Sequence, residues 1–124
     1  AALSLTLDSS NNATFAGTVS DSKGDLRTIV QNTQGSAYTL VAADAGKHIL
    51  ASGAVTVQNN TFTAGQAVTI VNNTSGDIAI TKAINDFYFT NDGSSASRTL
   101  ATRGMATILF ASATSAYISG AGLS

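Results

Sequence analysis

The chain has 124 residues and a net charge of −1, which fits one compact domain with at most a short arm attached. Six Lys and Arg residues against seven Asp leave no basic surface for nucleic-acid phosphates or anionic lipid headgroups. The absence of Cys excludes disulfides, a thiolate nucleophile and a cysteine-lined metal site. We therefore expect no nucleic-acid partner, and the lack of an apolar run of 18 residues predicts no membrane insertion.

The composition favours strands over helices. Seventeen Thr, 15 Ser and 11 Gly are present, whereas Glu and Pro are absent. β-Branched Thr packs well on pleated strands, and Ser and Asn side chains compete with the backbone bonds of a helix. Of the hydrophobic residues 21 are alanine, so we expect a thin core. The sequence predicts an all-β fold, an antiparallel β-sandwich or jelly-roll-like domain.

The N-terminal residues alternate in polarity like strands with one apolar face. Leu3, Leu5 and Leu7 share one side of a predicted strand, and residues 13–20 form a second strand after a polar turn. Another polar turn follows at residues 21–25. Two strands with so few large apolar side chains are marginal in water and need a partner. We predict that residues 1–36 form an N-terminal strand arm or stalk.

Strand patterns become denser from residue 26 onward. Turn signals recur roughly every 8 to 12 residues, the spacing typical of sandwiches. Residues 42–46 are an exception, because they fit one helical turn that ends at Gly46. Residues 68–73 and 78–81 are predicted to pair as a hairpin, and residues 37–124 to form a β-sandwich domain. The predicted strands are 26–30, 38–41, 47–50, 54–58, 67–72, 77–82, 86–90, 105–111 and 116–119.

Few residues suit catalysis or metal binding. His48 is the only histidine, and a single His without Cys or Glu cannot form a typical zinc site. No Ser lies in a G-x-S-x-G nucleophile motif. We expect no catalytic residues, no metal and no cofactor. Five aspartates fall in turns, where carboxylates cap the local backbone: Asp8, Asp21, Asp25, Asp77 and Asp92.

One carboxylate pair leaves an enzymatic alternative open. Asp86 and Asp92 bracket an aromatic strand, and two carboxylates that face each other across a groove are what glycoside hydrolysis requires. A carbohydrate depolymerase is therefore a third hypothesis beside the two non-enzymatic ones given below. It predicts release of reducing sugar from a polysaccharide, lost when either Asp is replaced.

An aromatic strand and the polar loop after it form the one segment with binding character. In Phe87-Tyr88-Phe89, alternation puts the two Phe side chains on one face, expected to be core, and Tyr88 on the other. Residues 90–95 present hydroxyl and amide groups, and loops on rigid β scaffolds often carry recognition. The candidate receptor-binding residues are Tyr88, Asn91, Asp92 and Ser94.

Four motifs follow one another in a fixed order after residue 37. They are Y-x-L-x-x-x-D-A-G-K-x-I at residues 38–49, F-x-x-G-x-x-(I/V)-T-(I/V)-x-N within 61–73, R-x-L-x-x-x-G-x-A-T at 98–107 and I-S-G-x-G-(L/V) within 117–123. Together they resemble a β-domain that is widespread in the virion proteins of tailed bacteriophages, over about residues 37–124. Upstream, residues 12–20 and 25–27 are similar to short strand modules of phage tail-fibre stalks.

The resemblance implies a non-enzymatic virion protein, usually homotrimeric, and it brings no catalytic residues. The first hypothesis is a trimeric tail-fibre or tip domain whose loop around Tyr88 to Ser95 contacts a host-surface glycan or protein. The second is a capsid decoration or head-fibre protein that joins neighbouring shell subunits through its N-terminal arm. Either places the chain in the phage particle with other virion proteins as partners. A bacterial adhesion module is also compatible with the composition.

Independent physical reasoning also favours association of three copies. A domain near 100 residues buries under about 70% of its unfolded surface, and here much of that surface belongs to Ala, Thr and Ser. Exposed strand edges invite pairing, and a closed cyclic assembly covers them. Small residues near the C-terminus would let three β surfaces approach closely. The trimer-interface candidates are Ala106, Ala111, Ala116 and Gly120, with Ala113 and Ala121 beside them.

Overall fold

A computed structural model describes residues 5–124 and divides the chain into two compact units, residues 1–30 and residues 31–124. Of the part of the chain described, the second unit holds most of the regular structure and all of the buried hydrophobic core. Among the residues described, no helix has the length and apolarity needed to cross a membrane.

Within residues 5–30, the first unit consists of two small antiparallel pairs. Strands β1 (Leu5–Leu7) and β2 (Ala13–Phe15) form one pair, and β3 (Ser20–Asp21) and β4 (Gly24–Asp25) form the other. The predicted strands are therefore present in shorter form, although Leu3 and Ser4 lie outside the described residues. Large apolar side chains are exposed to water in this unit. Leu7 is 67% exposed and Phe15 is 51% exposed.

The predicted caps of this unit are confirmed. Asp8 Oδ1 accepts hydrogen bonds from the backbone N–H groups of Ser10 (2.8 Å) and Asn12 (3.0 Å). Asp21 accepts one from the Lys23 N–H at 2.8 Å, and Asp25 one from the Arg27 N–H at 2.9 Å. These carboxylates stabilise turns by satisfying backbone donors, as short polar side chains commonly do. The two strand pairs are thus held by turns rather than by a core.

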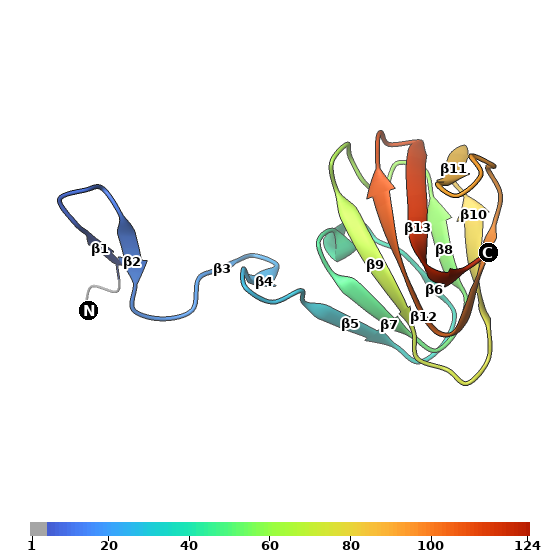
Figure 1. Ribbon diagram of the computed structural model, residues 1–124, viewed down its shortest axis with the longest axis horizontal. Coiled ribbons are helices and arrows are strands. Elements are labelled where there is room, and N and C mark those ends of the chain that lie inside the picture. Colours follow the sequence, from blue (N-terminus) through green and yellow to red (C-terminus); the bar gives the residue numbers. More distant parts are fainter. Residues whose placement is uncertain (1–4) are drawn as a thin grey trace. The chain divides into compact units, whose positions relative to one another are not determined.

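The second unit is an all-β, sandwich-like domain built from one nearly closed sheet of nine strands (Figure 1). The predicted all-β, sandwich-like class is confirmed. A single 3₁₀ turn, η1 (Ala42–Asp44), ends before Gly46 at φ +79°, as the sequence predicts. The strands are β5 (Gln31–Gln34), β6 (Tyr38–Thr39), β7 (His48–Ala51), β8 (Val55–Gln58), β9 (Ala67–Asn72), β10 (Ile78–Ala83), β11 (Asp86–Phe89), β12 (Arg98–Phe110) and β13 (Ser115–Leu123).

The first six strands of this unit wind as three successive coils. Strands β5, β7 and β9 pair in parallel on one side, with positions 31, 48 and 69 in register. Strands β6, β8 and β10 pair in parallel on the other, with positions 38, 55 and 80 in register. Each coil therefore contributes one strand to each of two layers. The pairing in the sheet is consequently mixed rather than uniformly antiparallel.

This winding corrects one local prediction. Strands β9 and β10 exist where expected, but they do not pair as a hairpin, because β9 pairs with β7 and β12 while β10 pairs with β8 and β12. The turn between them carries the chain from one layer to the other. Alternation of apolar residues identified both strands, but that pattern is the same for a hairpin and for a coil.

The long strand β12 joins the two layers. Its first residues pair antiparallel with β10, and residues 105–109 pair antiparallel with both β9 and β13. The register shifts between Leu100 and Met105, where Arg103 adopts φ +58°. Buried Asn72 holds this bend, since its Nδ2 donates to the carbonyls of Leu100 (3.0 Å) and Ala101 (2.9 Å). Strand β11 then pairs in parallel with β13 and extends the first layer.

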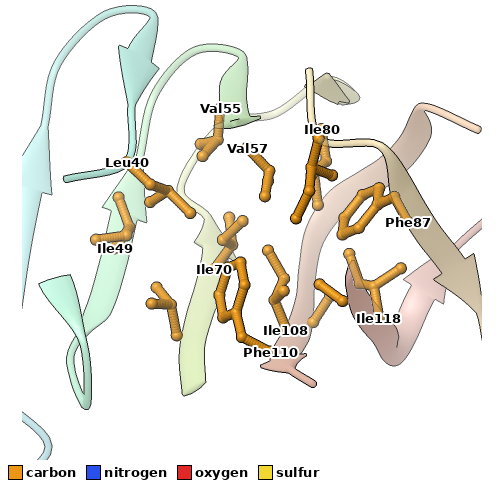
Figure 2. Packing of buried hydrophobic residues seen from close by; sticks show 14 of the residues in the cluster. Leu40, Ile49, Val55, Val57, Ile70, Ile80, Phe87, Ile108, Phe110 and Ile118 are labelled. Carbon is orange, nitrogen blue, oxygen red and sulfur yellow. The ribbon is translucent and has the colours of Figure 1, made fainter. Parts of the chain in front are cut away.

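The core lies between the two layers, where side chains from both point toward one another (Figure 2). The rings of Phe62 and Phe110 stack with centroids 4.3 Å apart, and Phe87 is fully buried. Burying an aliphatic or aromatic side chain of this size stabilises a fold by about 1.5–3 kcal/mol. Other fully buried members include Leu40, Ile49, Val55, Val57, Ile70, Ile80, Leu100, Ile108 and Ile118.

A polar cluster closes the core at the first coil. The buried Asp44 carboxylate accepts hydrogen bonds from Asn32 Nδ2 (2.8 Å), the Tyr38 hydroxyl (2.9 Å) and the Val41 N–H (2.9 Å). Gln34 Nε2 donates to Asn32 Oδ1 at 2.8 Å. Terminal coils of stacked folds need a polar face of this kind, because no further coil covers them.

The same cluster explains where the second unit begins. The sequence predicts a strand at Leu26–Val30 and a boundary after residue 36, whereas the strand is β5 (Gln31–Gln34) and the compact unit starts at Gln31. β5 is entirely polar, so no hydrophobic pattern marks it. Its inward positions, Asn32 and Gln34, belong to the sheet through hydrogen bonds instead of apolar packing.

Candidate functional site

Two tyrosines lie side by side on the outer surface of strands β11 and β13. The parallel register places Tyr88 opposite Tyr117, and their ring centroids are 5.3 Å apart with planes tilted by 39°. Their strand neighbours Phe87 and Ile118 point inward and are fully buried. The period of two along each strand therefore holds both tyrosine rings outward, and Tyr117 is 45% exposed.

The loop at residues 90–95 is fixed beside this pair by its own hydrogen bonds. The Gly93 N–H donates to the Phe89 carbonyl at 2.7 Å, and the Phe89 N–H donates to the Ser94 carbonyl at 2.8 Å. Asp92 Oδ1 accepts from both the N–H (2.8 Å) and the hydroxyl (2.6 Å) of Ser94. Gly93 has φ +75°, a conformation that a residue with a side chain rarely adopts. The loop is therefore a defined turn.

Arg98 ties the loop to strand β12. Its guanidinium carbon lies 4.8 Å from the centroid of the Phe89 ring, and its Nη2 donates to Ser94 Oγ at 2.9 Å. Its Nε also donates to the Ala96 carbonyl at 3.3 Å. A cation over an aromatic face contributes about 0.5–1 kcal/mol at an exposed position. Arg98 is thus engaged on three sides in holding the loop.

Two adjoining pockets border the loop. The first, of about 350 Å³, is lined by Tyr88, Phe89, Thr90, Gly93 and Tyr117. The second, of about 340 Å³, is lined by Phe89, Thr90, Asn91, Ser119, Gly120 and Leu123. They share Phe89 and Thr90, so they adjoin each other. The first is walled by aromatic rings, and the second also presents amide and hydroxyl groups.

The electrostatic surroundings of the pockets are acidic. The negative charge of Asp86, followed by desolvation, raises the pKa of Tyr88, so its hydroxyl stays protonated at neutral pH. Hydrogen bonds from the Ser94 side chain and backbone lower the pKa of Asp92, which therefore stays ionised. Among the residues that the structure describes, no Lys, Arg or His lines either pocket.

The four candidate receptor-binding residues separate into two groups. Tyr88 lines the first pocket and Asn91 lines the second. Asp92 and Ser94 are bonded to each other and fix the loop. Sequence reasoning missed Tyr117. Strand alternation predicts that Tyr117 points away from its neighbours Ala116 and Ile118, which are buried. Only the pairing of β11 with β13 brings Tyr117 to Tyr88.

The trimer-interface candidates lie in different environments. Ala106 and Ala116 are buried in the core, so their side chains are not presented to another copy. Gly120 has an intrachain reason for its small size, because a Cβ there would collide with the Met105 carbonyl oxygen across the β12–β13 pair. Ala111 is exposed and directly follows the last residue of β12, Phe110. The prediction was based on residue size alone, because the sequence does not specify toward which side of the sheet each of these residues points.

Another surface, here called the outer face, lies on the outward side of β7, β9 and β12, and its side chains are uncharged apart from the ionisable His48. Met105 is 55% exposed and Leu109 is 50% exposed on it. Across its middle, the hydroxyls of Thr69 and Thr107 share a hydrogen bond of 2.9 Å. Registers between the three strands define its members: His48, Leu50, Ala67, Thr69, Val71, Met105, Thr107 and Leu109.

His48 has a structural setting in this surface. Its Nε2 lies 3.1 Å from Oε1 of Gln31 on the neighbouring strand β5. Within residues 5–124, no group of three or more His, Cys, Asp or Glu side chains gathers as a metal site would require. The sequence argument against a zinc centre and the contact with Gln31 both concern His48, the single histidine of the chain.

The chain matches no protein-family model and no curated protein.

Proposed function

We propose that this chain is a non-enzymatic attachment protein of a tailed-bacteriophage virion, acting as a homotrimeric tail-fibre or tip domain. The observation that carries the proposal is the pair of half-buried Tyr88 and exposed Tyr117 beside a loop fixed by hydrogen bonds. Aromatic side chains on a rigid scaffold provide contact area at low entropic cost, which suits recognition. The order of the four sequence motifs adds the virion context.

The outer face supports the association of identical copies. Among its eight members only His48 is ionisable, so copies of this face meet without like-charge repulsion. Depletion of charge together with exposed Met is typical of the centre of an interface. Covering the exposed halves of Met105 and Leu109 stabilises the assembly by about 1 kcal/mol per side chain. A closed three-fold ring gives every copy the same environment.

Binding to bacterial surfaces tests the attachment role. Fluorescently labelled protein is incubated with a panel of bacterial strains, and bound fluorescence is measured by flow cytometry. The proposal expects saturable binding to at least one strain, reduced at least tenfold in affinity by Tyr117→Ala and retained by Tyr117→Phe. Thr99→Ala, on an exposed strand position of the opposite layer, serves as the matched control. Absence of binding to every strain, or unchanged binding by Tyr117→Ala, contradicts the proposal.

A second candidate is a capsid decoration or head-fibre protein, and the first unit is the observation that favours it. Its strands expose Leu5, Leu7 and Phe15, with Leu5 directly opposite Phe15 in the β1–β2 pair. An apolar strand face of this kind requires a covering surface, which a capsid lattice supplies. Imaging of intact virions with antibody against the chain distinguishes the two. Label at lattice positions of the head favours decoration, and label at the tail favours the fibre.

A further inference from the structure

We infer that the two adjoining pockets bind one neutral oligosaccharide of at least two sugar residues, with its first ring on Tyr88 and Tyr117 and its second beside Asn91 and Ser119. This inference rests on the proposed attachment function and specifies the chemistry of its ligand. Four observations lead to it, which concern the aromatic wall, the free polar groups, the charge and the size of the pockets.

The aromatic wall of the first pocket suits the apolar side of a sugar ring. Pyranoses carry C–H groups on one face and hydroxyls at the edge, and the rings of Tyr88 and Tyr117 offer apolar area with polar tips. The two rings are tilted by 39° rather than coplanar, and both line the first pocket. The first pocket therefore fits one ring packed against the tyrosines.

The second pocket offers unused hydrogen-bonding groups. The side chains of Thr90, Asn91 and Ser119 have no hydrogen-bond partner among the described residues of the chain. An amide and two hydroxyls both donate and accept, as sugar hydroxyls do. Binding sites of small ligands combine an apolar wall with a few such polar groups. The second pocket is therefore suited to a hydroxylated ring next to the first.

The charge around the pockets selects against acidic sugars. Asp86 and Asp92 place negative charge beside them. Arg98 lies beside the loop, and its guanidinium is held by Phe89, Ser94 and Ala96. A carboxylated or phosphorylated sugar would meet these carboxylates, and none of the described residues that line the two pockets is a cation that could pair with it. A neutral sugar meets no such cost.

The two pockets together have room for more than one sugar residue. At about 350 Å³ and 340 Å³, each lies near the lower end of the range of roughly 300–1,000 Å³ for ligand sites. One residue occupies only one of them and leaves either the aromatic or the polar wall unused. Because the pockets share Phe89 and Thr90, a linked second residue reaches the adjoining one. The hydrogen-bonded loop keeps the cost of ordering the site low.

A glycan array and calorimetry with the purified full chain test the inference. The probes are neutral and acidic glycans of one to four residues, including glucose, maltose, lactose and sialyllactose. We expect binding to neutral glycans only, with affinity rising at least tenfold from one residue to two. Tyr117→Ala removes binding and Tyr117→Phe keeps it. Asn91→Ala lowers disaccharide affinity to the level of the monosaccharide. Thr99→Ala serves as the control, and thermal melting verifies that each variant is folded.

Three results overturn the inference. They are no glycan binding on the array, preference for acidic glycans, and equal affinity for one residue and two. The outcomes separate it from the attachment function. If Tyr117→Ala loses cell binding but no glycan binds, attachment stands and the receptor is a protein. If neutral glycans bind through the pockets but no bacterial strain is bound, the sugar site stands and the attachment function fails.

Discussion

The Tyr38 hydroxyl donates a 2.9 Å hydrogen bond to Oδ2 of Asp44, whose carboxylate is buried at the end of the core. The same oxygen accepts the Val41 N–H, so one carboxylate holds both the first strand of the second layer and the 3₁₀ turn. Both residues belong to the Y-x-L-x-x-x-D-A-G-K-x-I motif. That motif therefore specifies a structural joint, and Leu40 between the two residues is a fully buried core residue.

Replacing Tyr38 by Phe is expected to destabilise the fold. The change removes a donor to Asp44 and an acceptor for Asn32, and leaves a buried carboxylate with one partner fewer. Loss of one partner from a buried polar group costs about 1–3 kcal/mol. Chemical denaturation followed by circular dichroism measures this loss. Tyr117→Phe is the matched control, since it removes a hydroxyl that is exposed and is expected to leave stability unchanged. Equal stability of the two variants would show that the cluster does not hold the first coil.

Alkaline pH is expected to weaken the same cluster. Burial, followed by the hydrogen bond to Asp44, raises the pKa of Tyr38 above its ordinary value of 10.0. The folded state therefore holds the phenol proton more tightly than the unfolded chain. The stabilisation is complete below pH 10.0 and is lost as the pH rises from there through the folded pKa. Unfolding free energies of the wild type and Tyr38→Phe should converge across this range, and a gap that stays constant with pH contradicts the assignment.

Gly120 is expected to be intolerant of any side chain. A Cβ at this position would meet the Met105 carbonyl oxygen and lie 2.8 Å from the Ala106 Cβ, so β12 and β13 would have to separate. Forced overpacking of this kind costs about 1–3 kcal/mol. Gly76 is the matched control, because no atom lies within 4 Å of its added Cβ. Thermal melting should show a lowered midpoint for Gly120→Ala and an unchanged midpoint for Gly76→Ala. An unchanged melting midpoint for Gly120→Ala would mean that the two strands separate at little cost in free energy.

Much of the fold was predictable from the sequence because strand alternation is a local property. Residues 67–72 were predicted as a strand and form β9 without a shift, and the single turn before Gly46 was also located. The direction of pairing was not predictable. Equivalent positions recur at 31, 48 and 69 in one layer and at 38, 55 and 80 in the other, so the coils differ in length and leave no constant period.

The candidate site was only half visible in the sequence for the same reason. Tyr88 and Asn91 follow each other along the chain and could be selected as neighbours. Tyr117 comes from a strand that pairs with β11 only after β12 has reversed the chain, which no local pattern encodes. The interface candidates Ala106 and Ala116 were selected for their size, but their buried orientation depends on the tertiary register.

The outer face provides the direct test of self-association. Leu109→Asp places a carboxylate at an exposed apolar position of β12 and is expected to prevent assembly while the monomer stays folded. Ala79→Asp is the matched control, an exposed position on β10 in the opposite layer. Loss of assembly in both variants would instead indicate a general effect of charge.

Sedimentation equilibrium of the wild-type chain at micromolar concentration measures the assembly itself. Three chains of 12.5 kDa give a predicted mass of about 37.5 kDa, which is 3 × 12.5 kDa, and Leu109→Asp should sediment at 12.5 kDa. A wild-type mass of 12.5 kDa would leave Met105 and Leu109 permanently in water and would contradict the trimer.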